Sequence, residues 1–316
     1  MKYSLLFPGQ GSQSVGMLAE LAATDPRVDE TFKEASRILG WDVLRLVREG
    51  PEEELNRTQR TQPALLAAGI AVWRAWRADG GRQPAAMAGH SLGEYTALVA
   101  GGSIAFGDAL KLVELRGRLM QNAVPEGQGT MAAIIGLDDA AVEKLCAGYP
   151  GPGVLEPANF NAPGQVVVAG SKAGLDWLLA NAKTLGARKV LPLQMSVPSH
   201  CSLMRAAAAQ LAEELVKVEV RAPVLPVIHN IDCRPRTEPD SIRDALIGQL
   251  HHPVRWSQSV RAMAESGIAA FFECGPGKVL TNLNKRILEA GRFVALEQPE
   301  GIAEGRALIN SQGEQA

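Results

Sequence analysis

The chain has 316 residues, which is long enough for one large α/β domain or two unequal domains. Of these residues, 46% are hydrophobic and 21% are charged, a composition typical of a globular protein. Its formal net charge of −2 excludes a general attraction to nucleic acid or to an anionic membrane surface. No window reaches the length of a membrane span, and the four cysteines lie far apart without a C-x-x-C pair, so we expect a cytoplasmic protein with free thiols and no metal site.

The first part of the chain alternates strand and helix patterns. The first strand runs into the loop Pro8-Gly9-Gln10-Gly11, whose residue types favour a tight turn. Apolar residues then recur with helical spacing over two long stretches, and Gly80-Gly81 ends the first of them. The expected elements are strands at residues 3–7 and 85–88 and helices at residues 61–76 and 106–123. This alternation is typical of an α/β domain.

Ser91 lies between the second strand and a helical pattern, in Gly89-His90-Ser91-Leu92-Gly93. In a G-x-S-x-G nucleophile elbow, the glycines let the backbone turn sharply, and the serine oxygen is held at the N-terminus of a helix. Residues 92–100 carry the small and apolar side chains of a helix that packs on a sheet, with Glu94 in its first turn. Ser91 is therefore the candidate nucleophile.

The pattern changes between residues 127 and 196. The elements expected there are strands at residues 130–137, 154–160, 165–169 and 188–195 and helices at residues 138–147 and 172–185. Their order is β-α-β-β-α-β, which is that of the ferredoxin-like unit. We therefore predict that residues 127–196 form a small ferredoxin-like domain inserted into a larger domain, which comprises residues 1–126 and 197–299.

After the insert, the α/β alternation of the larger domain resumes. The expected elements are strands at residues 224–230 and 269–273 and helices at residues 203–218, 240–250, 257–266 and 278–290. Residues 300–316 are polar, and we expect them to form a frayed C-terminal tail.

A serine nucleophile needs a base, because its hydroxyl is scarcely ionised at neutral pH. The side chain of His90 should diverge from Ser91, and His229 ends a buried strand, where a core role is expected. The tandem His251-His252 lacks the spacing of a helical metal site and favours a surface or interface role. His200 is the best candidate, because it lies on the loop that returns from the insert and precedes a helix.

The third member of a catalytic triad is absent, since no Asp or Glu occupies a suitable loop position. A Ser-His dyad whose imidazole is oriented by a carbonyl satisfies the same geometry.

Arg116 is the other informative residue. Most helical arginines are solvated, but a buried arginine that faces the elbow would present a fork suited to a substrate carboxylate.

Several separate segments, taken together and in this order, resemble those of a known family over nearly the whole chain, from Lys2 to about Leu288. These segments are Phe7-Pro8-Gly9-Gln10-Gly11-Ser12-Gln13, Thr61-Gln62-Pro63-Ala64, Gly89-His90-Ser91-Leu92-Gly93-Glu94-Tyr95, Arg116-Gly117, Asn159-Phe160-Asn161, Val197-Pro198-Ser199-His200, Gln249 and Gly275-Pro276-Gly277-Lys278-Val279-Leu280. Together they resemble the malonyl-CoA:acyl carrier protein transacylases of bacterial type II fatty-acid synthesis. The resemblance implies an α/β-hydrolase-like core with a parallel sheet and a ferredoxin-like insert.

The resemblance also implies a role for each matching residue. Ser91 would accept the acyl group, His200 would be its base, and Arg116 would pair with the free carboxylate of malonate. The other residues that it assigns are Gln10 and Leu92, whose backbone N–H groups would form the oxyanion hole, Gln249, whose carbonyl would orient the histidine, and Asn159 and Asn161, which would face the coenzyme A or pantetheine arm.

The implied reaction transfers a malonyl group from malonyl-CoA to the phosphopantetheine thiol of acyl carrier protein through a malonyl-serine, in a ping-pong cycle. The resemblance implies no bound cofactor or metal. Acyl carrier protein is typically acidic, so we expect transient docking on a local basic patch near the cleft, for which the candidates are Arg188, Lys189, Lys285 and Arg286. Scattered solvated charges are the alternative. The balanced charge permits a monomer.

Other functions remain open at this point. The same chemistry could serve polyketide synthesis or a malonate decarboxylase. A serine hydrolase is a further alternative, against which Arg116 and the missing acidic residue argue. A catalytically silent docking subunit is disfavoured by the presence of Ser91, His200, Arg116 and Gln10.

Overall fold

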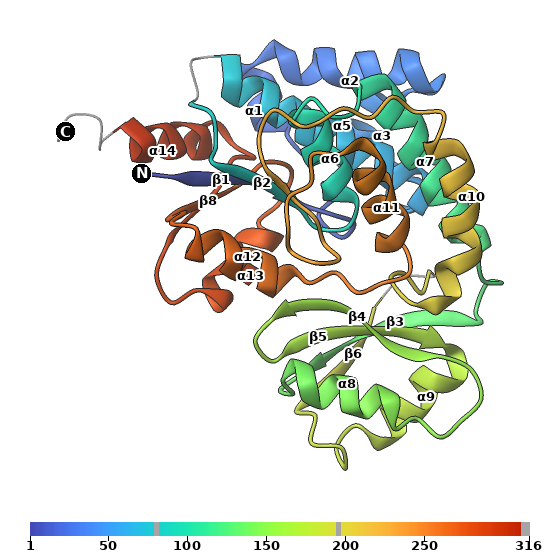
Figure 1. Ribbon diagram of the computed structural model, residues 1–316. Coiled ribbons are helices and arrows are strands. Elements are labelled where there is room, and N and C mark those ends of the chain that lie inside the picture. The colour runs from blue at the N-terminus through green and yellow to red at the C-terminus, as the bar shows by residue number, and fades with distance from the viewer. Residues whose placement is uncertain (79–81, 194–196, 311–316) are drawn as a thin grey trace.

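The computed structural model describes residues 1–78, 82–193 and 197–310, which form two lobes (Figure 1). The larger lobe is built on a parallel sheet, and the smaller lobe is built on a separate antiparallel sheet. The predicted α/β class with an antiparallel unit in mid-chain is therefore confirmed. No helix in the described ranges is long and apolar enough to cross a membrane.

Five parallel strands form the sheet of the larger lobe, in the order β7-β2-β1-β8-β9. Their bounds are β1 Tyr3–Phe7, β2 Ala86–Gly89, β7 Val227–Ile228, β8 Ala270–Glu273 and β9 Arg292–Ala295. Successive side chains of β1 enter different cores, with Leu5 and Phe7 on one face and Leu6 on the other. Strand β9 was not predicted from the sequence, because it lies at the edge of the sheet and is only four residues long, too short for a periodic pattern.

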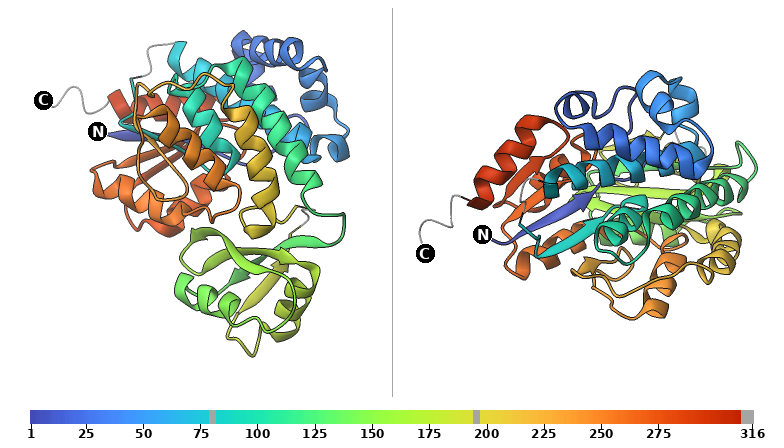
Figure 2. Two further views of the ribbon diagram at one scale, coloured as in Figure 1. Left: turned by 45° about the vertical axis from the view of Figure 1, so that its right-hand side comes forward. Right: turned by 90° about the horizontal axis from the view of Figure 1, so that it is seen from above.

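Helices cover both faces of this sheet (Figure 2). One layer contains α1 Ala19–Thr24, α2 Pro26–Leu39, α3 Val43–Glu49, α4 Glu52–Leu55, α5 Thr58–Ala78, α6 Leu92–Ala100, α7 Phe106–Asn122, the short 3₁₀ helix Ser202–Met204, α10 Arg205–Leu215 and α11 Pro239–Gln249. The core on the other face includes α12 Trp256–Glu265 and α13 Val279–Ile287. Helix α5 is apolar around most of its circumference, so neighbouring helices surround it.

The smaller lobe has the predicted β-α-β-β-α-β order. Its elements are β3 Gly129–Ile135, α8 Asp139–Ala147, β4 Leu155–Ala162, β5 Gln165–Ser171, α9 Lys172–Asn181 and β6 Lys189–Pro192, with the strands arranged β4-β5-β3-β6. One face of this sheet packs on α8 and α9, and on the other face Met131 and Val167 pack with Cys201. The end of the strand expected at residues 188–195 lies outside the described residues, as does the expected helix end at Gly80-Gly81.

Strand β4 fastens the smaller lobe to the larger one. The Phe160 N–H donates to the Val254 carbonyl at 2.9 Å, and the Val254 N–H donates to the Ala158 carbonyl at 2.8 Å. The Glu156 carboxylate accepts from the backbone N–H of Ser202 at 2.7 Å and from its hydroxyl at 2.6 Å. Because Ser202 follows closely after His200, these bonds fix the histidine loop against the smaller lobe.

The C-terminal segment differs from the expected frayed tail. Pro299–Asn310 forms α14, and the side chains of Ile302 and Ile309 are buried. Residues 302, 305 and 309 lie on one helix face, and Gly305 lets this face approach the Trp76 ring. The spaced apolar residues therefore outweigh the polar composition of the segment. Residues 311–316 lie outside the described part of the chain.

Candidate active site

Ser91 lies at a sharp turn between β2 and α6, at the carboxyl end of the parallel sheet. Its φ of +52° is rare for a residue with a side chain, and its backbone N–H donates to the Asn230 side chain at 2.8 Å. A Cβ at Gly93 would lie 2.0 Å from the Phe7 carbonyl oxygen, and a Cβ at Gly89 would lie 1.8 Å from the Gly93 carbonyl carbon. Both glycines are thus required for the close packing of the predicted elbow.

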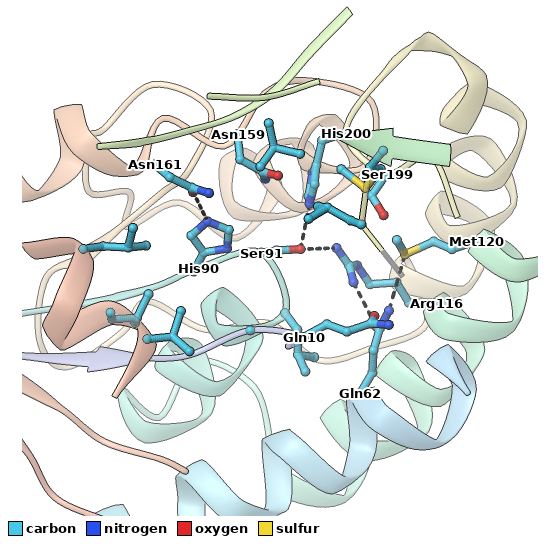
Figure 3. Close-up of a pocket in the computed structure, with 18 residues that line it drawn as sticks. Gln10, Gln62, His90, Ser91, Arg116, Met120, Asn159, Asn161, Ser199 and His200 are labelled. Atoms are coloured by element: carbon cyan, nitrogen blue, oxygen red, sulfur yellow. Dashed lines mark hydrogen bonds between the residues drawn. The ribbon is translucent and has the colours of Figure 1, made fainter. Parts of the chain in front are cut away.

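His200 reaches Ser91 from the loop that follows the smaller lobe. Its Nε2 lies 2.8 Å from Ser91 Oγ (Figure 3). Its Nδ1 lies 2.7 Å from the backbone carbonyl oxygen of Gln249. Since a carbonyl can only accept, Nδ1 carries the ring proton and Nε2 is free to accept the serine proton. The structure thus brings together the Ser-His pair and the carbonyl that the sequence analysis expected.

The other histidine in the pocket points elsewhere. His90 Nε2 lies 2.8 Å from the Asn161 Oδ1 atom, so this ring bridges the elbow to β4 of the smaller lobe (Figure 3). Burial lowers the pKa of His90 from its ordinary value. Burial also lowers the pKa of His200 to about 3, and the positive charge of Arg116 adds to this effect. Both rings are therefore neutral near pH 7.

Arg116 comes from α7 and is buried, with 1% of its surface exposed. One terminal nitrogen donates to Gln62 Oε1 at 2.8 Å, and the other donates to Gln249 Oε1 at 2.9 Å and to Ser91 Oγ at 3.2 Å. The guanidinium carbon lies 5.3 Å from the centre of the Tyr95 ring. Of the two alternatives for Arg116, the structure therefore shows the buried arginine that faces the elbow, and not a solvated one.

The surroundings of Arg116 lack a direct negative partner. Its three hydrogen-bond acceptors are neutral, and no ion pair within the described residues includes it. Burial lowers the pKa of Arg116, while Tyr95 and Glu94 oppose this shift. A buried guanidinium that contacts only neutral groups beside a nucleophile is well suited to bind the carboxylate of a ligand.

A pocket of about 150 Å³ lies in front of Ser91 and is lined by both lobes. Gln10, from the loop after β1, and Leu92, the first residue of α6, stand beside the serine. The N–H of Leu92 has no acceptor within its own helix, because the first turn of any helix lacks one. Asn159 and Asn161, on β4, line the side of the pocket formed by the smaller lobe.

Sequence reasoning gave no role to three buried polar residues of the site. Gln62 on α5 contacts Arg116, and Asn230 holds the Ser91 N–H. Glu94 on α6 is fully buried beneath the elbow. A signal did exist for Gln62 and Glu94, since each polar side chain interrupts an otherwise apolar helical stretch.

Known proteins resemble this chain over nearly its whole length. Residues 5–300 match the acyl transferase domain family. The malonyl CoA-acyl carrier protein transacylase of Escherichia coli K12 is 54% identical over 302 residues, which cover 96% of this chain and 98% of that protein. The crystal structure of an acyl carrier protein S-malonyltransferase from Vibrio cholerae is 53% identical with a TM-score of 0.94, covering 96% of this chain and 99% of that one.

A further solved structure contains a carrier protein. It is a complex of a type II polyketide synthase acyl-carrier protein with its malonyl-transacylase, and the match is 49% identical with a TM-score of 0.94, covering 96% of this chain and 98% of that chain. The family match spans nearly the whole chain and includes the serine elbow, the histidine loop and the buried arginine. The chain belongs to the acyl transferase family.

Proposed function

We propose that this chain transfers the malonyl group from malonyl-CoA to the phosphopantetheine thiol of acyl carrier protein and thereby supplies the extender unit for fatty-acid synthesis. The observation that carries the proposal is the position of Arg116. A buried cation without a carboxylate partner, 3.2 Å from Ser91 Oγ, matches an acyl group that bears a free carboxylate. The names of the relatives support the same substrate class.

The first half-reaction forms a malonyl-serine ester. Ser91 Oγ attacks the thioester carbonyl while its proton moves to Nε2 of His200, which is 2.8 Å away. The backbone N–H groups of Gln10 and Leu92 donate to the tetrahedral oxyanion, each with a contribution of roughly 3–4 kcal/mol. The C–S bond then breaks, and the coenzyme A sulfur leaves with the proton held by His200.

The second half-reaction is the reverse chemistry with another thiol. His200 takes the proton of the phosphopantetheine thiol, whose sulfur attacks the malonyl-serine carbonyl. Ser91 leaves and regains the proton from His200, so the enzyme returns to its starting state. Asn159 and Asn161 offer amide groups to the pantetheine arm along the pocket wall of the smaller lobe.

The proposed docking surface for acyl carrier protein lies around the hairpin between β4 and β5. In the sheet of the smaller lobe, Gln165 and Lys189 both pair with Ile135, so they lie in one row. Arg286, on α13, donates to the Gln165 side chain and to the Pro163 carbonyl. Two further basic residues, Arg188 and Lys285, adjoin Lys189 and Arg286 in sequence. Their positions support one basic patch across both lobes rather than scattered charges.

Two further properties belong to the same proposal. The four cysteines are all free thiols, which favours the cytoplasm. The chain acts as a monomer that binds malonyl-CoA and acyl carrier protein in turn and requires no cofactor.

Intact-protein mass spectrometry after brief exposure to malonyl-CoA tests the function. We expect a malonyl adduct on the native chain and none on Ser91→Ala, and acyl carrier protein in its holo form should discharge the adduct. Acetyl-CoA should give much less adduct, because it leaves Arg116 unpaired. Release of free malonate without an adduct would instead indicate a hydrolase. Equal labelling by acetyl-CoA would remove Arg116 from its assigned role.

A further inference from the structure

Glu94 is a buried carboxylate that the mechanism above does not use. It lies on the first helical turn after Ser91 and is 0% exposed. One oxygen lies 2.7 Å from Nδ1 of His229, and the other accepts from the Asn230 N–H and from Nε2 of Gln249, each at 2.9 Å. The Asn230 and Gln249 groups can only donate, so this Glu94 oxygen accepts two hydrogen bonds.

The amide of Gln249 connects this carboxylate to the arginine. Its Nε2 also donates to the Ser91 carbonyl at 2.9 Å, while its Oε1 accepts from Arg116 at 2.9 Å. If the amide turned over, its NH₂ group would face the guanidinium and its oxygen would face two acceptors, Glu94 and the Ser91 carbonyl. Glu94 therefore selects the orientation in which Gln249 presents its oxygen to Arg116.

Gln249 also holds the catalytic base. Its backbone carbonyl accepts from Nδ1 of His200, while its side chain contacts Arg116. One residue thus aligns the base and the cation relative to Ser91. The buried cation and the buried anion are separated by a single amide, so that Glu94 compensates the charge of Arg116 while no substrate carboxylate is bound.

We propose that Glu94 is a positioning residue for substrate selection: through the side-chain amide of Gln249 it fixes the Arg116 guanidinium in the place that receives the malonyl carboxylate. This inference rests on the proposed role of Arg116. It assigns a function to the Gln249 side chain in addition to that of its backbone carbonyl.

The substitution Glu94→Gln tests the proposal, because it keeps the size of the side chain and removes its charge. The new amide oxygen can accept from Asn230 and Gln249, and its NH₂ group can donate to His229 if that ring changes tautomer. Relative to acetyl-CoA, kcat/KM for malonyl-CoA should fall about tenfold, the factor expected when a charge-assisted hydrogen bond becomes a neutral one. The loss should appear in KM, since Arg116 holds the carboxylate in both the ground state and the transition state.

Glu273→Gln is the matched control. Glu273 is also a buried glutamate, and its carboxylate accepts from the backbone N–H groups of Leu280 and Thr281 at the start of α13. Its replacement should lower stability but leave the malonyl-to-acetyl ratio within twofold. In an Arg116→Gln background, Glu94→Gln should leave the ratio unchanged, because the residue through which it acts is gone.

The outcomes separate this inference from the proposed function. A native chain that forms no malonyl adduct would refute the function itself. A native chain that is selective, with a Glu94→Gln variant whose ratio stays within twofold or rises, would refute only the role of Glu94. The role of Glu94 would also be refuted if kcat fell equally with malonyl-CoA and acetyl-CoA while KM stayed unchanged, because that result would indicate damage to the elbow. If Glu94→Gln does not fold, Gln249→Met removes the same amide link, and an unchanged ratio in that variant overturns the proposal.

Discussion

At the scale of single residues, the proposed nucleophile Ser91 and the proposed base His200 both have a strained backbone conformation. In the described ranges, four residues other than glycine have a positive φ, and Ser91 and His200 are two of them. Such conformations cost about 1–3 kcal/mol each and persist only where the surroundings hold them. Here the Ser91 N–H donates to Asn230, and the His200 N–H donates to the Leu250 carbonyl at 3.0 Å. The strain is thus stabilised by long-range contacts that aim both side chains into one pocket.

Replacement of Arg116 should change the choice of substrate more than the chemistry. Arg116→Gln removes the charge that we propose pairs with the malonyl carboxylate. We expect kcat/KM for malonyl-CoA to fall roughly 10²–10³-fold, as for the loss of a buried charge-assisted pair of about 3–4 kcal/mol. Adduct formation with acetyl-CoA should fall by a much smaller factor. Rates of acylation with both donors, followed by mass spectrometry, check this. Equal losses with both donors would contradict the assignment.

The pH dependence of acylation should follow the lowered pKa of His200. Because this pKa is about 3 in the free enzyme, the base stays neutral, and kcat/KM should remain flat from pH 8 to about pH 5. A malonyl carboxylate on Arg116 offsets part of the positive charge that lowers this pKa, so substrate binding makes His200 a stronger base. A profile that bends near pH 6.5, the ordinary value for histidine, would contradict the expectation.

The same shift has a consequence for stability. Between pH 6.5 and about 3, the unfolded chain protonates His200 and the native chain does not, so the unfolded state binds more protons. The contribution of this group to stability is therefore complete above pH 6.5 and is lost as the pH falls. Denaturation of the native chain and of His200→Gln as a function of pH measures this contribution.

At the scale of elements, the contact between α5 and α7 sets the distance between Gln62 and Arg116. Gly117 follows Arg116 on α7, and a Cβ there would lie 2.7 Å from both the Thr58 carbonyl oxygen and the Gln59 Cα atom. Gly117→Ala should therefore push the helices apart, with a loss of about 1–3 kcal/mol in the free energy of unfolding. We also expect a several-fold higher KM for malonyl-CoA, because Arg116 moves with α7.

Gly107→Ala on the same helix is the control for this prediction. A Cβ at Gly107 would meet only the Ile38 Cδ1 atom at 3.6 Å, which is an ordinary contact. Alanine also favours helix over glycine, so stability should be unchanged or slightly higher. Chemical denaturation of both variants, with steady-state kinetics, gives the comparison. Unaltered stability in Gly117→Ala would show that the helices can absorb the added methyl group.

At the scale of the whole molecule, the two lobes share both the pocket and the proposed docking surface. The charge reversal Lys189→Glu with Arg286→Glu places one change on each lobe. We expect KM for acyl carrier protein to rise roughly tenfold at low salt, and less at high salt, because rim charges steer the association of an acidic partner. Formation of the malonyl-serine from malonyl-CoA should change much less. Lys33→Glu, on α2 at the far side of the larger lobe, is the control (Figure 1).

A KM for acyl carrier protein that is unaffected by both reversals would place docking elsewhere. Should malonyl-CoA acylation fall by the same factor as transfer to the carrier protein, the patch would instead serve the phosphates of coenzyme A. Comparison of single-turnover acylation with the second half-reaction distinguishes these results.

The sequence by itself determined the features that depend on local pattern. Apolar periodicity located most of the strands and several of the longer helices, because each element must bury one face or stripe, but it did not locate β9 or α14. The spacing of Gly89, Ser91 and Gly93, between a strand pattern and a helix pattern, predicted the elbow. In the structure, a Cβ at either glycine would clash with backbone atoms. Loop position made His200 a candidate and residue type made Arg116 one, and the resemblance then implied a role for each. The fold class and the family were therefore accessible before any coordinates.

Only the tertiary structure decided which polar groups meet. Arg116 is buried, and it contacts Gln62 and Gln249. Gln249 in turn contacts Glu94. These contacts join residues on different helices that are up to 155 positions apart in sequence. Local periodicity reports the face that a residue occupies and not the partner opposite that face. Helix α14 was missed for a related reason, since its few apolar residues become informative only when the core beside Trp76 is present to receive them.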